Sequence, residues 1–128
     1  MRLTRSEQQA VFDIALEKKN AFSVDWNLDA EDVAFNIKET VPNLEINGLQ
    51  GKQVLGDWIE TVIIEGKEYK FNLDSETKPL EIVSKANQHL KKTGQTFVFF
   101  DSNDDEYCFI LINLSELLSY LEKGFLGV

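Results

Sequence analysis

The stretch WIETVIIEGKEYKFNL, residues 58–73, determines the fold class. Glu65-Gly66 is a turn signal between two arms that are rich in β-branched and aromatic residues. In the second arm, Tyr69, Phe71 and Leu73 alternate with polar residues, which is typical of a strand with one buried and one solvent-exposed face. The first arm is almost continuously apolar toward its end, which indicates a central strand. Because a two-residue turn joins antiparallel strands, residues 58–73 are predicted to form a β-hairpin.

The flanking sequence alternates between helix and strand patterns. Two further apolar runs, 96–100 and 107–112, are joined by the polar segment 101–106 and predict a second hairpin. Helices are indicated by apolar residues spaced three and four apart, by capping residues before the first turn and by glycine after the last. These criteria predict four helices: 6–19 after the capping box Thr4–Glu7, from the N-cap Asp29 to about 39, from 77 to about 92, and from the cap Ser115 to Gly124. Residues 21–26 alternate between apolar and polar side chains and predict a strand.

Residues 42–56 have no clean periodicity. The dipeptides Asn47-Gly48 and Gln50-Gly51 are turn signals, so we interpret this region as a mobile loop or a short edge hairpin closed by Asn47-Gly48. The element order is then α-β-α-(β)-β-β-α-β-β-α. It predicts a single α+β domain over residues 1–128, with an antiparallel or mixed sheet of four to six strands and helices mainly on one face.

Length and composition exclude several classes of protein. The chain has 128 residues, the size of one domain, since domains cluster at roughly 100–150 residues. Its net charge of −9 argues against direct binding to nucleic acid or to an anionic membrane. Cys108 is the only cysteine, so neither an intramolecular disulfide nor a cysteine-based zinc site is expected. No apolar signal segment or membrane span is evident, and we expect a cytoplasmic protein.

The negative charge is concentrated in two short clusters, Asp25 to Asp32 and Asp101 to Glu106. Both follow predicted strands, and they would form one acidic edge if those strands were neighbours. The first cluster also suits a helix N-terminus, and the second also suits a solubilising hairpin loop. The three consecutive acids Asp104-Asp105-Glu106 repel one another, which favours a functional role for the second cluster.

The sequence contains no motif for catalysis or cofactor binding. Walker A, G-x-G-x-x-G, G-x-S-x-G and H-E-x-x-H patterns are all absent. The single histidine, His89, is expected to be an exposed or semi-exposed helix residue because no partner for it is evident. Cys108 is expected to be a small core residue. We therefore expect no enzymatic activity, no cofactor and no metal.

The segment Asp101-x-Asn103-x-Asp105 imitates the first half of a calcium loop. It is not expected to bind calcium, because Glu106 stands where the loop needs glycine and Ile112 stands where it needs a bidentate glutamate.

Each of the two tryptophans, Trp26 and Trp58, follows an aspartate directly. We expect both to be core anchors. The alternative is an exposed aromatic side chain inside an acidic rim, which is the composition of interface hot spots.

A small, strongly acidic α+β domain without catalytic residues resembles the immunity proteins of bacterial polymorphic-toxin and contact-dependent inhibition systems. The likeness rests on the acidic hairpin 101–107, the strand 109–112 and the cluster from Asp25-Trp26 to Asp32. It is a resemblance of type, and it implies that the protein neutralises a basic toxin domain, often a nuclease, by occluding its active site. A non-catalytic regulatory or adaptor domain and an acidic nucleic-acid mimic are the alternatives. The expected partner-binding residues are Asp25, Trp26, Asp29, Glu31, Asp32, Asp101, Asp104, Asp105, Glu106 and Tyr107.

Overall fold

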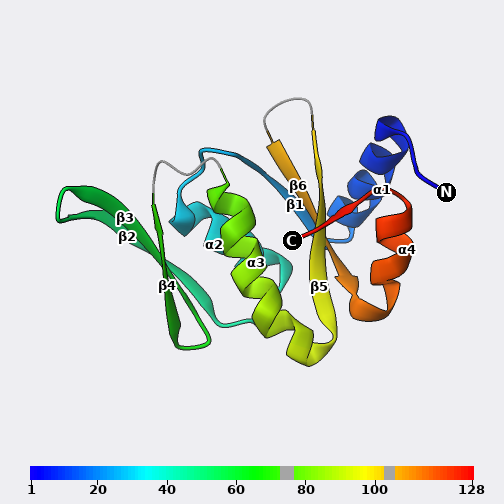
Figure 1. The fold of residues 1–128 in the computed structure, drawn as a ribbon. Helices are drawn as coiled ribbons and strands as arrows, with labels where there is room; N and C mark the ends of the chain where they lie inside the picture. The colour runs from blue at the N-terminus through cyan, green and yellow to red at the C-terminus, as the bar shows by residue number, and fades with distance from the viewer. Residues whose placement is uncertain (73–76, 103–105) are drawn as a thin grey trace.

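The structure, a computed structural model, describes residues 1–72, 77–102 and 106–128 (Figure 1). Its elements are α1 (Arg5–Glu17), β1 (Ala21–Asp25), α2 (Ala30–Thr40), β2 (Ile46–Val54), β3 (Asp57–Ile64), β4 (Lys67–Asn72), α3 (Lys78–Leu90), β5 (Gln95–Asp101), β6 (Glu106–Asn113), α4 (Leu117–Glu122) and β7 (Leu126–Gly127), with short 3₁₀ turns at Lys91–Thr93 and Leu114–Glu116.

The strands form two antiparallel sheets, which confirms the α+β class. The four-stranded sheet has the order β1-β6-β5-β7, and the three-stranded sheet has the order β2-β3-β4 with β3 at its centre. The hairpin predicted from residue 58 is β3–β4; its last residue, Leu73, lies outside the described residues. Glu65 and Gly66 both have positive φ, 49° and 83°, as a two-residue turn of type I′ requires.

Helices cover both faces of the four-stranded sheet. Helices α2 and α3 lie between the two sheets, and α1 and α4 pack on the other side of the four-stranded sheet (Figure 1). From the sequence we expect one sheet with helices mainly on one face. The difference arises because β5 is apolar on both faces: Phe97 and Phe99 join the core with α2 and α3, while Val98 and Phe100 join the core with α1.

The interpretation of 42–56 as a loop, or as a hairpin turned at Asn47-Gly48, is wrong. Residues Ile46–Val54 are a strand paired with β3, and the turn is at Leu55-Gly56. The two glycines within β2 serve close approach instead. A Cβ on Gly48 would lie 2.5 Å from Cα of Glu31, and one on Gly51 would lie 2.3 Å from Nε1 of Trp58.

The predicted helix caps are confirmed for α1 and α2 but not for the last helix. Thr4 and Glu7 form the capping box of α1, and Asp29 Oδ1 accepts a hydrogen bond from the backbone N–H of Asp32 at 3.0 Å. Ser115 does not cap α4, because it lies inside a 3₁₀ turn, Leu114–Glu116, that precedes the helix. Asn113 occupies the N-cap position of that turn, and Glu116 occupies the N-cap position of α4.

Candidate functional site

The structure brings acids of both predicted clusters together at one end of the four-stranded sheet. Strands β1 and β6 are antiparallel neighbours, and their register places Asp25 opposite Glu106. On the other side of β6, Asp101 at the end of β5 lies opposite Tyr107. We call Asp25, Asp101 and Glu106 the acidic sheet end. The two clusters were expected to meet only if their strands were neighbours. Strands β1 and β6 are neighbours, so the clusters meet.

The acidic sheet end carries uncompensated negative charge. Among the described residues, no basic side chain forms an ion pair with Asp25, Asp101 or Glu106. This negative charge also acts on the thiol of Cys108. Its pKa is raised to about 11, first by burial and then by the charges of Glu106, Asp101 and Asp13. As expected, Cys108 is a buried core residue.

Two aromatic residues of the predicted binding set adjoin these acids. Trp26 follows Asp25 and is 38% exposed, so the expectation that it anchors the core is wrong. Trp26 belongs to the turn between β1 and α2 and not to either sheet, and its exposed surface is available for contact. Tyr107 is half-buried, with its ring 6.0 Å from that of Phe99 and 6.3 Å from that of Phe109 between centroids. Its ring thus packs on the core from the acidic end of the sheet.

The remaining acids of the first cluster belong to a different surface, the N-terminus of α2. Asp29 caps the helix, and the pKa of Asp32 is raised, first by its hydrogen bond with the Asp29 side chain and then by desolvation and the charges of Asp29 and Glu31. Asp29 and Glu31 also line a cavity of about 360 Å³, together with Trp58 and Glu60. Trp58 is 44% exposed at this cavity and is not a core anchor. Its indole instead lies against Gly51 of the neighbouring strand.

Asp104 and Asp105, which the sequence analysis also assigned to the partner-binding set, lie outside the described residues.

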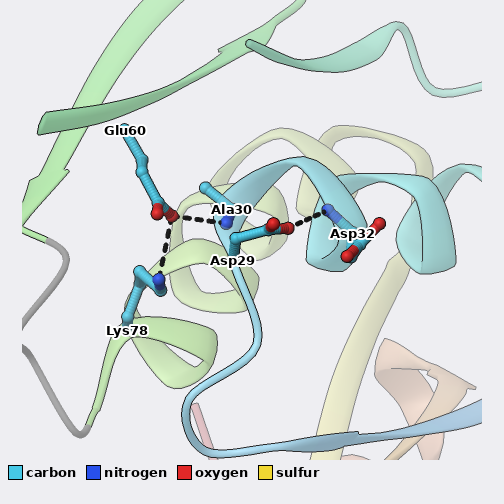
Figure 2. A network of polar contacts seen from close by, with 5 residues as sticks. All are labelled: Asp29, Ala30, Asp32, Glu60 and Lys78. Atoms are coloured by element: carbon cyan, nitrogen blue, oxygen red, sulfur yellow. Dashed lines mark hydrogen bonds and ion pairs between the residues drawn. The ribbon is translucent and has the colours of Figure 1, made fainter. Parts of the chain in front are cut away.

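Glu60, which lines this cavity, is also the centre of a buried polar network that was not predicted from the sequence. Figure 2 shows the network. Oε1 of Glu60 in β3 is 2.8 Å from Nζ of Lys78 and accepts a hydrogen bond from the backbone N–H of Ala30 at 2.6 Å. Glu60 thus joins β3 to the first turn of α3 and to the N-terminus of α2. The one available signal was a single carboxylate in an otherwise apolar and β-branched run, because buried charges require a partner.

His89 is a partly exposed residue of α3, within the range that was expected, but it has two side-chain partners that the sequence did not suggest. Its ring nitrogens lie 2.9 Å from the hydroxyl of Tyr69 and 2.8 Å from Oε1 of Glu65. Both partners come from the β3–β4 hairpin, 20 and 24 residues before His89, so no local pattern points to them. Glu65 and His89 also line a cavity of about 270 Å³ at the end of α3.

Comparison with protein-family models identifies the family of this chain. A family model described as "Domain of unknown function (DUF6630)" matches residues 4–118. The chain belongs to the DUF6630 family. None of the curated proteins and none of the solved structures matches the chain.

The DUF6630 match spans the acidic sheet end, the Glu60 network and the His89 contacts. Within the described part of this DUF6630 chain, no group of three or more histidine, cysteine, aspartate or glutamate side chains is placed to hold a metal ion. No helix in the described ranges is both long and apolar enough to cross a membrane.

Proposed function

We propose that this protein is a binding module that recognises a basic protein partner through the acidic sheet end. One observation carries the proposal: Asp25 lies opposite Glu106 in register, with Asp101 on the next strand. Like charges placed directly opposite each other on adjacent strands destabilise a sheet. Among the described residues this pair has no ion-pair partner, so it lowers the stability of the domain alone, and a basic partner would supply positive charge.

The electrostatics favour a basic partner over a neutral or acidic one. Clustered charge of one sign steers an oppositely charged protein to the surface and raises the association rate. The exposed indole of Trp26 beside Asp25 adds an aromatic side chain of the kind that dominates binding energy at interfaces. We propose more specifically that the partner is a toxin domain with a cationic active site, which this protein occludes. A nuclease has such a site, because it must hold phosphate.

The proposal is tested by growth rescue. The C-terminal domain of the protein encoded directly upstream is expressed in a bacterial host, alone and together with this protein. We expect growth arrest by the domain alone and recovery on co-expression. Growth arrest that co-expression of the folded protein does not relieve, or an upstream domain with no effect on growth, would count against the immunity role.

A matched pair of variants then locates the surface. The sheet-end variant carries Asp25→Asn, Asp101→Asn and Glu106→Gln. The control variant carries Glu39→Gln, Glu45→Gln and Glu68→Gln at exposed positions elsewhere, with the same change in net charge. Loss of rescue in the sheet-end variant alone is the expected result. Equal loss in both variants would mean that only net charge matters.

A further inference from the structure

Three titratable side chains form a hydrogen-bonded relay between the β3–β4 hairpin and α3. The hydroxyl of Tyr69 lies 2.9 Å from Nε2 of His89, and Nδ1 of His89 lies 2.8 Å from Oε1 of Glu65. The His89 side chain is 10% exposed and that of Glu65 is 44% exposed. The imidazole is thus largely shielded from water, while the carboxylate reaches solvent.

With an ionised Glu65 carboxylate and a neutral His89 imidazole, each of the two hydrogen bonds has one possible direction. An ionised carboxylate only accepts, so Nδ1 of His89 carries the proton that it donates to Glu65. In the neutral imidazole Nε2 is then an acceptor, and the Tyr69 hydroxyl donates to it. A hydroxyl held on an imidazole that is itself oriented by a carboxylate is the arrangement of a nucleophile, its general base and an orienting group.

Two lysines place positive charge at the ring of Tyr69. Nζ of Lys67, two residues earlier on β4, and Nζ of Lys85, one helical turn before His89, each lie 5.5 Å from the ring centroid. Ammonium groups attract an anionic reactant and raise its local concentration.

The other two tyrosines do not combine a histidine hydrogen bond with a nearby lysine. Tyr120 has Nζ of Lys123 at 5.2 Å from its ring centroid, but the only histidine of the chain is at Tyr69. Burial, and then the charge of Glu116, raise the pKa of Tyr120. Tyr107 lies in register with Asp101, where negative charge repels an anion. Tyr120 therefore has a cation without a base, which makes it an internal control.

We propose that Tyr69 is a nucleophilic acceptor site for a phosphoryl group, with His89 as the general base, Glu65 as the positioning residue, and Lys67 and Lys85 as the groups that bind the anionic donor. The donor class is a phosphate ester or anhydride with a good leaving group. Oη of Tyr69 forms a bond to phosphorus, and the bond from phosphorus to the leaving-group oxygen breaks, its electron pair departing with that oxygen. The hydroxyl proton moves to Nε2 of His89, and Glu65 stabilises the resulting imidazolium. The product is one phosphotyrosine per chain, independent of the partner-binding surface.

The test uses 4-nitrophenyl phosphate as donor and the full chain as acceptor. Release of 4-nitrophenolate gives the rate, and peptide mass spectrometry locates the phosphoryl group. We expect about one equivalent on Tyr69, none on Tyr120, and none in Tyr69→Phe. His89→Gln lowers the maximal rate on the order of 100-fold, because it removes the general base. Lys67→Gln, at an exposed position, raises the donor concentration that gives half the maximal rate and leaves the maximal rate less changed.

Melting curves on each variant separate loss of the base from loss of the fold. Absence of phosphate on Tyr69 in the folded wild type would overturn the proposal. So would equal labelling of Tyr69 and Tyr120, or an unchanged rate in a folded His89→Gln variant. If His89→Gln does not fold, two other measurements test the proposal. They are the ratio of Tyr69 to Tyr120 labelling in the wild type and the rise in half-saturating donor concentration in Lys67→Gln.

Discussion

Glu60 and Lys78 form an ion pair, with 2.8 Å between Oε1 and Nζ, in which both side chains are almost completely buried, at 4% and 0% exposure. The same carboxylate oxygen accepts the N–H of Ala30 (Figure 2). One side chain of the three-stranded sheet thereby fixes both helices that separate this sheet from the four-stranded one.

Removal of one member of this pair is expected to be strongly destabilising. Lys78→Met leaves the Glu60 carboxylate buried without its counter-ion, a change that typically costs about 3–5 kcal/mol. The double variant Glu60→Gln/Lys78→Met removes both charges and should recover at least half of that loss. Urea unfolding of both variants measures this, with Lys70→Met at an exposed position of β4 as the control. A single variant that loses less than about 1 kcal/mol would show that the pair does not hold the helices.

Gly48 is predicted to tolerate no side chain. A Cβ there would meet the backbone of α2, at 2.5 Å from Cα of Glu31 and 3.1 Å from the carbonyl oxygen of Ala30. We expect Gly48→Ala to destabilise the fold by about 1–3 kcal/mol, because the helix has to move away from the strand. Gly127→Ala, where no heavy atom lies within 4 Å of the added Cβ, is the matched control. Equal melting temperatures for the two variants would contradict the close approach of α2 and β2.

Leu55 is strained and fully exposed at the tip of the β2–β3 hairpin. Its φ is 50° and its side chain is 100% exposed, so it adopts a left-handed conformation without burying apolar surface. Leu55→Asn should stabilise the protein by about 0.5–1 kcal/mol, since asparagine adopts this conformation at lower cost. The control is Leu118→Asn on α4, where the leucine is also exposed but lies in a helix and the change should be slightly destabilising. Thermal unfolding compares the two, and a lower melting temperature for Leu55→Asn would contradict the strain.

The thiol of Cys108 is predicted to be unreactive in the folded protein. With its pKa at about 11, far less thiolate is present at pH 8 than in the unfolded chain, where the thiol has a pKa of about 8.5. An aromatic disulfide reagent should therefore react on the order of 100-fold more slowly without urea than with it. The native state holds this proton more tightly than the unfolded state, so the free energy of unfolding should fall as pH rises from about 8.5 to 11. In Cys108→Ala this decline in the free energy of unfolding should be absent. A native thiol that reacts as fast as the unfolded one would contradict the raised pKa of Cys108.

Elements with a strong local period could be predicted from the sequence. The alternation of Tyr69 with Phe71 located β4, and the two-sided apolar run 96–100 located β5. Strand β2 was missed because Gly48 and Gly51 resemble turn residues, whereas the structure uses them for tertiary approach. Sequence composition contains no information on such approach.

The candidate site was predictable only in part, for the same reason. The two acidic clusters are visible in the sequence, but their meeting at Asp25 and Glu106 depends on strand order. The division of the first cluster, with Asp29 and Glu31 on a separate cavity, depends on where α2 packs. The contacts of His89 and Lys78 join residues 18 or more positions apart, beyond any periodic signal.

The acidic sheet end is tested most directly by the salt dependence of association with the domain encoded directly upstream. Association rates are measured from low to high salt for the wild type, for the sheet-end variant and for the control variant with three neutralised acids elsewhere. We expect the sheet-end variant to associate at least about tenfold more slowly at low salt, with a flatter salt dependence, and to melt no lower than the wild type because like-charge repulsion is removed. The control variant should stay close to the wild type. Equal association rates and equal salt slopes for the sheet-end variant and the wild type would contradict the account and leave Asp25, Asp101 and Glu106 as solubilising residues only.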